Sequence, residues 1–297
     1  MITPRSELLN GKALAFVGSG TMAEAMIRVL LDQRRALPAH ICASGPRQER
    51  AQELHRRCGV IGCTDNREAV EAADLVVLSV KPQVMPRVLA ELRGLIFPGG
   101  LVLSIVAGVD IGTISSGLQH QAVVRAMPNT PAQIGQGMTV WTASPYVTDC
   151  QREAARAVLE VMGREIYVED EEMLDMATAV SGTGPTYVFM MMEALTDAAV
   201  HLGFSRRVAI QLVTHTVLGS ANFARQSDRH LAELRNMVTS PGGTSAEAIY
   251  QLEKGGLRTV LSKAVWAAYQ KSRLLGQTFQ PLADPNGLPG PDGDVRP

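Results

Sequence analysis

A glycine-rich turn near the N-terminus has the spacing of a dinucleotide-binding motif. Its sequence, GSGTMA over residues 18–23, fits the pattern G-x-G-x-x-[G/A] and lies between an apolar run and a helical pattern. Gly18 permits a tight turn, Gly20 lets the backbone approach a pyrophosphate, and Ala23 allows close packing of helix and sheet. Free N–H groups at the start of the helix favour phosphate charge. The motif predicts a dinucleotide site, and a glycine-rich turn without a ligand is the alternative.

The end of the second apolar run indicates which dinucleotide is bound. A site for NAD places Asp or Glu there, about 20 residues beyond the motif, to bind the ribose hydroxyls. This chain has Ser44 and Arg47 instead. A guanidinium can pair with a 2′-phosphate through two hydrogen bonds, so the sequence favours NADP(H), with NADPH preferred and NAD as a second option. Arg47 could equally be a solvated residue in the first turn of a helix.

Two further segments follow apolar runs in the first half of the chain. Lys81 and Pro82 come after the third run, and Asn129 lies between two prolines in MPNTP, residues 127–131. Both segments are expected at the carboxyl edge of a parallel sheet, where open α/β sheets bind ligands. The alternative for each is a stiff proline turn with no ligand.

Two segments in the second half combine glycines with hydroxyls. SGTGP occupies residues 181–185 and SPGGTS occupies residues 240–245, each before a helical pattern. Hydroxyls and free N–H groups at a helix start can hold an anion. One such segment is usually only a helix cap, but two in one domain indicate a site for a small carboxylate.

The elements that must position these segments alternate in the first half. Runs that are apolar on both faces suit strands of a parallel sheet covered by helices on each side. We therefore expect an α/β fold with a Rossmann-type doubly wound sheet. The predicted strands cover residues 13–17, 40–44, 75–80, 101–106 and 122–126, and helix-length segments between them include 23–33, 47–57 and 84–93.

Helical patterns alone follow residue 168, over 185–202, 206–225, 231–237 and 245–275, the last interrupted at Gly255-Gly256. Val188–Val200 is apolar nearly all round, and few helices remain to bury it. Burial against a second copy of the chain is therefore favoured over a central helix in a monomeric bundle. The expected division is a dinucleotide-binding domain over 1–168, an all-helical dimerisation and substrate domain over 169–280, and a disordered tail over 281–297.

Composition narrows the function classes for these 297 residues. The net charge of −1 and the aromatic share of 4% argue against nucleic acid as a partner. No apolar run is long enough to span a bilayer, and residues 1–12 lack a secretory signal, so no membrane partner is expected. The four cysteines form no CxxC pair, and His55 near Cys58 and Cys63 does not complete a zinc site. We expect free thiols, no metal and a cytoplasmic location.

These segments, in this order, resemble the pyrroline-5-carboxylate reductase family over about residues 12–277. The matching motifs are GSGTMAEAM, VKP at residues 80–82, MPNTP, SGTGPTYVF with EALTDAAV, SPGGTS and LEKGGLRTVLSKAV. The family implies an oxidoreductase with a Rossmann domain and a helical domain that dimerises by interleaving, often with assembly into decamers. The implied reaction, the last step of proline biosynthesis, moves hydride from C4 of NAD(P)H to the C5=N carbon of L-Δ1-pyrroline-5-carboxylate and yields L-proline.

The resemblance also assigns residues. Ser245 takes the place of a residue that is usually threonine and hydrogen-bonds near the ring nitrogen, so it is the catalytic candidate. A protonated imine is already electrophilic and needs positioning more than a strong acid. The substrate is expected between two subunits, bound by Ser181, Gly182, Thr183, Gly184, Gly242, Gly243, Thr244 and Ser245, with its carboxylate held by residues 181–184 and 242–244. The expected cofactor-binding residues are Gly18, Ser19, Gly20, Thr21, Met22, Ser44, Arg47, Asn66, Val80, Lys81, Pro82, Ala107 and Asn129.

The chain departs from the family pattern before SPGGTS. It has His230-Leu231 and Leu234-Arg235-Asn236 where the family often has His-Pro and Leu-Lys-Asp. Two other functions stay open. A hydroxyacid dehydrogenase needs a general acid/base, commonly a lysine in the helical domain, but neither Lys254 nor Lys263 lies on the apolar helix after SGTGP. A non-catalytic NADP-binding regulator would not need both carboxylate-binding segments.

Overall fold

The computed structural model describes Leu9 and residues 11–277, which divide into two compact units. The first contains the described residues up to Thr178 and those from Gln270 onward, and the second is Ala179–Tyr269. The sequence alone places the division at 168/169. In the structure the first unit runs through Thr178, and Asp175 within it pairs with Arg125 and accepts a hydrogen bond from Ser272. The expected tail over 281–297 lies outside the described residues.

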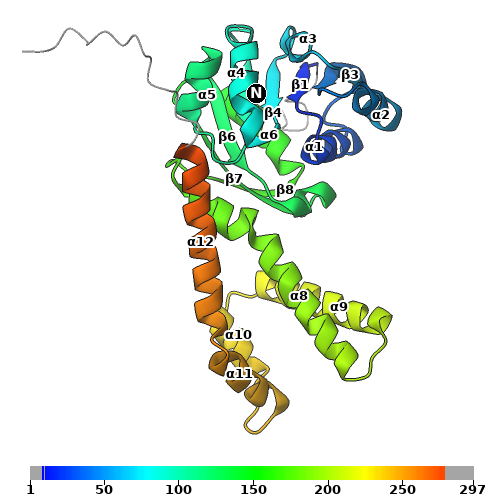
Figure 1. Ribbon diagram of the computed structural model, residues 1–297, viewed down its shortest axis with the longest axis vertical. Helices are drawn as coiled ribbons and strands as arrows, with labels where there is room; N and C mark the ends of the chain where they lie inside the picture. The colour runs from blue at the N-terminus through cyan, green and yellow to red at the C-terminus, as the bar shows by residue number, and fades with distance from the viewer. Residues whose placement is uncertain (1–8, 10, 278–297) are drawn as a thin grey trace, which may run out of the picture. The chain divides into compact units, whose positions relative to one another are not determined.

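Eight strands form one sheet in the first unit, in the order β3-β2-β1-β4-β5-β6-β7-β8 (Figure 1). Neighbouring strands are parallel except β6 and β7, which pair antiparallel. The chain moves outward from β1 to β3 and then returns to β4, which creates a topological switch point between β1 and β4. The strands are β1 Leu14–Val17, β2 Ile41–Ser44, β3 Ile61–Cys63, β4 Leu75–Leu78, β5 Leu101–Ser104, β6 Val123–Met127, β7 Gly137–Ala143 and β8 Gly163–Tyr167. The expected doubly wound α/β fold is confirmed.

Helices cover both faces of this sheet. The core on one face includes Phe16 and Trp141, which pack with α1 (Thr21–Asp32), α2 (Gln48–Cys58) and α6 (Asp149–Glu160). The core on the other face includes Val17 and Val76, with α3 (Asn66–Val70), α4 (Met85–Leu92) and α5 (Ile111–Leu118). Every residue of β1, β4 and β5 is buried, so these strands have no solvent-facing side and appear in the sequence as apolar runs, broken only by Ser104 at the end of β5.

Three strands are absent from the sequence-based expectation. β3 has only three residues, including Gly62, and Ile61 within it is exposed. β8 alternates between exposed and half-buried positions at the end of the sheet. β7 contains two buried threonines, Thr139 and Thr142, which interrupt its apolar pattern. Each strand therefore lacks the continuous apolar run that identifies the central strands.

The second unit contains helices and no strand among its described residues. A π-helical turn over Thr178–Gly182 leads into α8 (Gly184–His201), followed by α9 (Arg206–Gln226), α10 (Leu231–Met237), α11 (Thr244–Lys254) and α12 (Leu257–Gln277), which continues into the first unit. α8 and α9 pack against each other. Short helix α7 (Met173–Ala177) precedes the π-helical turn. Among the described residues, no helix combines the length and apolar character needed to cross a bilayer.

Candidate active site

The glycine-rich turn connects β1 to α1 at the carboxyl edge of the sheet. Gly18 has φ +102°, and a Cβ there would lie 2.8 Å from the backbone carbonyl of Ser79. Packing against the end of β4 therefore requires glycine at this position. Gly20 is the residue before α1, and a Cβ there would meet no protein atom within 4 Å. The space beside Gly20 and the first N–H groups of α1 is open to a ligand, as a bound pyrophosphate requires.

A cavity of about 280 Å³ lies beside this turn. Its lining includes Gly18 after β1, Gly45 after β2, Asn66 after β3 and Val80 after β4. The structure thus brings Gly18, Asn66 and Val80 of the expected cofactor set together at the switch point. Arg87 from α4 also lines the cavity.

Glu91 of α4 lines the same cavity and was missed, with Arg87, by the sequence analysis. Neither residue belongs to a recognisable motif. One signal could have found them: they are separated by four positions in a helix whose other positions are mainly apolar, and such residues share one face. The sequence does not show what this face of α4 contacts, because that depends on how α4 packs against the sheet.

Ser44 holds the side chain of Asn66, which lines the cavity. It is fully buried, and its hydroxyl donates a hydrogen bond to Oδ1 of Asn66 at 2.7 Å. Nδ2 of Asn66 donates in turn to Oε2 of Glu91 at 3.0 Å. These two bonds connect the ends of β2 and α3 to α4 and hold the Asn66 amide in one orientation.

Arg47 lies outside this cavity. It is exposed and immediately precedes α2, where it lines a separate groove with Arg50, Glu53 and other charged residues. Arg50 is fully engaged, because Nε donates to the carbonyl oxygen of Ser19 at 2.9 Å and the guanidinium also pairs with Glu53 and a second carboxylate. Arg50 therefore supports the glycine-rich turn, a role that the sequence analysis missed.

The remaining expected cofactor residues also follow strands at this edge. Lys81 is exposed and precedes a 3₁₀ turn over Pro82–Val84. Ala107 is half-buried just beyond β5. Asn129 follows β6, and its Oδ1 accepts a hydrogen bond from the backbone N–H of Met138 at 2.9 Å. Asn129 thus secures the proline-rich loop to β7 at the edge where the other residues gather.

The first hydroxyl- and glycine-rich segment is helical. Ser181 and Gly182 belong to the π-helical turn, and Thr183 directly precedes α8 at Gly184. The segment before the helical pattern is therefore itself a widened helical turn. Single π-turns of this kind occur frequently at functional sites, because the wider turn redirects backbone groups.

The second segment has the expected position at a helix start. Gly242 has φ +70°, which suits glycine, and Gly243 precedes α11. A Cβ at Gly243 would come within 2.4 Å of the Ser240 hydroxyl, so a side chain there would require that hydroxyl to move. Thr244 and Ser245 occupy the first turn of α11, with Ser245 half-buried. Their backbone N–H groups are at the positive end of the helix.

The two segments lie apart within the second unit. Figure 1 shows the start of α8 and the start of α11 in different regions of that unit. The departure before SPGGTS leaves α10 intact, because Nδ1 of His230 accepts a hydrogen bond from the N–H of Ala232 and caps the helix. One chain therefore does not bring its own SGTGP and SPGGTS segments together.

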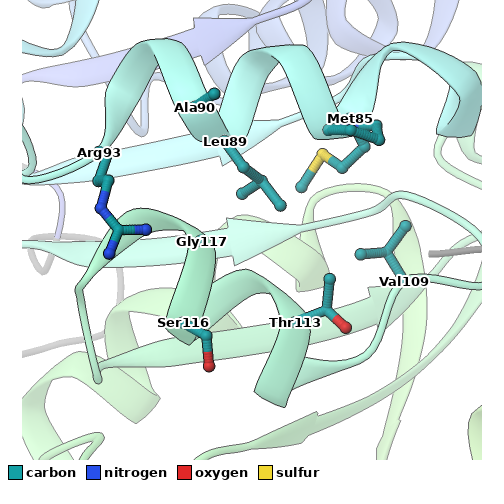
Figure 2. A pocket seen from close by; sticks show the side chains of 9 residues that line it. Met85, Leu89, Ala90, Arg93, Val109, Thr113, Ser116 and Gly117 are labelled. Atoms are coloured by element: carbon teal, nitrogen blue, oxygen red, sulfur yellow. The ribbon is translucent and has the colours of Figure 1, made fainter. Parts of the chain in front are cut away.

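A different groove, of about 410 Å³, separates α4 from α5 (Figure 2). Its floor includes Met85 and Leu89 of α4 and Val109, with Arg93 at one end. None of the expected site residues lines this groove. The expected cofactor residues Gly18, Asn66 and Val80 meet at the switch point and not here.

The cysteines are free in the described chain. Sγ of Cys42 and Sγ of Cys63 lie 3.6 Å apart on adjacent strands, and burial, together with the neighbouring Cys42 thiol, raises the pKa of Cys63 to about 12. Among the residues that the structure describes, no group of three or more His, Cys, Asp or Glu side chains could hold a metal ion.

Comparisons with known proteins decide the family. Residues 171–275 match the model for pyrroline-5-carboxylate reductase dimerisation, and residues 13–108 match that for NADP oxidoreductase, coenzyme F420-dependent. The pyrroline-5-carboxylate reductase of Synechocystis is 40% identical over 89% of this chain and 98% of its own length. The chain belongs to the pyrroline-5-carboxylate reductase family. The enzyme of the same name from Pseudomonas aeruginosa is 40% identical over 93% of this chain and 98% of its own length.

Solved structures of this reductase family share the fold. A pyrroline-5-carboxylate reductase from Coxiella burnetii has a TM-score of 0.80 at 35% identity and covers 90% of this chain and 99% of its own. The Plasmodium falciparum pyrroline carboxylate reductase, solved with NADP bound, has a TM-score of 0.83 at 28% identity with the same coverage. The resemblance seen in the motifs is confirmed, and neither a hydroxyacid dehydrogenase nor a non-catalytic regulator is favoured.

Proposed function

We propose that this protein is a pyrroline-5-carboxylate reductase that oxidises NADPH and reduces L-Δ1-pyrroline-5-carboxylate to L-proline, the last step of proline biosynthesis. The observation that carries the proposal is that a chain matching such reductases over 98% of their length keeps both SGTGP and SPGGTS. A regulator that binds only the dinucleotide would not need two segments that can hold a substrate carboxylate.

The carboxyl edge of the sheet fits an NADP(H) molecule. In this proposal the turn from Gly18 to Met22 holds the pyrophosphate, since the space beside Gly20 is open. The cavity beside Asn66 would take the adenosine half. Pro46 lines this cavity, and Arg47 is the next residue along the chain, outside the lining. The other expected contacts at the strand ends are Ser44, Val80, Lys81, Pro82, Ala107 and Asn129. When bound, the cofactor supplies a hydride from C4 of the nicotinamide.

The substrate is held by the two segments of the helical unit. Backbone N–H groups at Ser181–Gly184 and at Gly242–Thr244 would bind its carboxylate, because the start of α11 concentrates free N–H donors. The Ser245 hydroxyl accepts a hydrogen bond from the protonated ring nitrogen and keeps the proton there, which preserves the electrophilic character of C5. Catalysis then rests on positioning, since a protonated imine needs no strong acid.

A homodimer completes this site, with the two segments contributed by different subunits. Support comes from the dimerisation model over residues 171–275 and from the apolar surface of the helical unit. Phe189 and Met190 of α8 are 58% and 65% exposed in the single chain. A second copy would bury this surface. Assembly of dimers into a decamer and a cytoplasmic location complete the proposal.

Turnover with both cofactors tests the proposal. Purified protein, mixed with L-Δ1-pyrroline-5-carboxylate and NADPH, should consume the reduced nicotinamide and form proline in equal amounts. NADH should support slower turnover. Absence of proline formation with either cofactor would overturn the assignment. Sedimentation of the same sample gives the oligomeric state and separates the dimer from the decamer.

A further inference from the structure

We propose that Arg87 and Glu91 of α4 discriminate NADPH from NADH, with Arg87 binding the 2′-phosphate and Glu91 positioning Asn66. The inference rests on the proposed use of NADP(H). The sequence alone places the residues that distinguish the two cofactors after β2. Arg87 and Glu91 would add α4 to that site.

α4 presents two different faces. Met85 and Leu92 are fully buried in the core against the sheet. Arg87 and Glu91, one turn apart, line the cavity that Gly18 and other strand ends also line. Residues four positions apart lie on the same side of a helix. The burial of the apolar face therefore directs both charged side chains to the cavity.

The apolar part of this cavity does not distinguish the two cofactors. Val80, Val84 and Val88 contribute side chains to the lining. Such a wall suits the flat face of an adenine ring, which NADH and NADPH have in common. Discrimination must therefore come from charged and polar groups in the lining.

Arg87 is the cation available in the cavity. It is exposed, and it makes no ion pair or hydrogen bond within the part of the chain that the structure describes. Arg47 lines the separate groove outside, and Arg50 is bound to Ser19 and to two carboxylates. Arg67 of α3 is already paired with Asp65 at 2.9 Å. A phosphate dianion binds best to a cation that is not already paired with a carboxylate. The guanidinium of Arg87 is such a cation, and it can donate two hydrogen bonds to the phosphate.

Glu91 determines how Asn66 faces the cofactor. A carboxylate can only accept hydrogen bonds, so the Asn66 amide must turn its nitrogen towards Glu91, at 3.0 Å, and its oxygen towards the Ser44 hydroxyl. One N–H of the amide remains for a ribose or phosphate oxygen. The negative charge of Glu91 also opposes the 2′-phosphate. Glu91 is therefore a positioning residue for Asn66, and its negative charge weakens the binding of NADPH.

Dissociation constants for both cofactors test the role of Arg87. We would titrate wild-type protein, Arg87→Ala and Arg93→Ala with NADPH and NADH and follow nicotinamide fluorescence. Arg87→Ala should raise the Kd of NADPH about tenfold and change that of NADH less than about twofold. Arg93→Ala removes the same charge from the residue directly after α4, at the groove of Figure 2, and both constants should stay unchanged. Equal losses for both cofactors would mean an adenine contact and would overturn the proposal, as would no change.

Two variants of Glu91 test positioning against charge. Glu91→Gln keeps an acceptor for Asn66 and removes the negative charge, so it should lower the Kd of NADPH and leave that of NADH within about twofold. Glu91→Ala removes the acceptor as well, and it should weaken both cofactors. Identical constants for the two variants would contradict the positioning role.

Turnover of the wild-type enzyme separates this inference from the proposed function. If wild-type protein forms proline while Arg87→Ala keeps the cofactor preference, only the inference fails. If wild-type protein binds NADPH with the predicted dependence on Arg87 but forms no proline, only the proposed function fails. Absence of binding to either dinucleotide would overturn both.

Discussion

Gly18 and Ser79 contact each other across the switch point of the sheet. The Ser79 hydroxyl donates a hydrogen bond to the carbonyl oxygen of Gly18 at 2.9 Å, and a Cβ on residue 18 would lie 2.8 Å from the Ser79 carbonyl. The end of β4 thus excludes any side chain at this position. Gly20 differs, since no protein atom limits a Cβ there. The two glycines of one motif therefore differ: contact with Ser79 requires glycine at residue 18, whereas the space beside Gly20 is open.

Substitution of the two glycines should separate folding from binding. Gly20→Ala should change the free energy of unfolding by less than about 1 kcal/mol, because φ is −76° and the space is open. It should raise the Kd of NADPH at least tenfold, because the methyl group enters the pyrophosphate site. Gly18→Ala should destabilise the fold by about 1–3 kcal/mol through backbone strain and the Ser79 contact. Denaturant unfolding and cofactor titration measure both, and equal stability loss in the two variants would contradict this division.

Ser245 should affect turnover and not cofactor binding. Ser245→Ala removes the hydroxyl expected at the substrate ring nitrogen and should lower kcat by roughly 100-fold. The Kd of NADPH should stay within about twofold, because α11 belongs to the helical unit. Ser245→Thr keeps the hydroxyl and should retain most of the activity. Unchanged kcat in the alanine variant would remove Ser245 from the mechanism.

A charge on α8 should break the dimer. Met190→Glu places a carboxylate on an apolar helix that is expected to pack against a second copy, and burying an unpaired charge is costly. Sedimentation should then show the mass of a single chain and little turnover. Leu37→Glu is the matched control, because Leu37 is 61% exposed but lies in the first unit. A dimer of normal stability for Met190→Glu would argue against this interface.

Loss of Arg125 should destabilise the first unit. This arginine of β6 is buried and pairs with Glu171 at 2.9 Å and with Asp175 at 3.5 Å. Arg125→Ala leaves both carboxylates without their cation and should lower the free energy of unfolding by about 3 kcal/mol. Arg67→Ala removes an exposed ion pair with Asp65 and should cost less than about 1 kcal/mol. Chemical denaturation of both variants measures the difference, and similar losses would show that the buried network adds little.

His120 should make the fold less stable in mild acid. It is buried, and a ring nitrogen lies 3.0 Å from the carbonyl oxygen of Gly100. Burial lowers the pKa of His120, so the unfolded chain binds a proton at a pH where the folded chain does not. The free energy of unfolding should therefore fall as the pH drops below about 6.5. Urea unfolding across that pH range should show a smaller fall in the free energy of unfolding for His120→Gln. The same pH dependence in both proteins would show that His120 does not cause the fall.

Much of the architecture follows from local sequence. The central strands are buried on both faces, so they form uninterrupted apolar runs between helix-length segments. The ranges of α9 and α10 and the break between α11 and α12 at Gly255-Gly256 also follow from periodicity and glycine placement. β3 and β8 were not predicted, because a short or half-exposed strand at the end of a sheet lacks that continuous pattern.

The sequence by itself determined the class of ligand, the order of the central strands and the family, because motif spacing and apolar pattern are local properties. Only the tertiary structure decided which groups meet. Arg47 has the expected type and position for a phosphate contact, yet it lines an outer groove, while Arg87 and Glu91 enter the cavity beside Asn66. The physical reason is that strand register brings the strand ends together, and the buried face of α4 sets which of its side chains reach them.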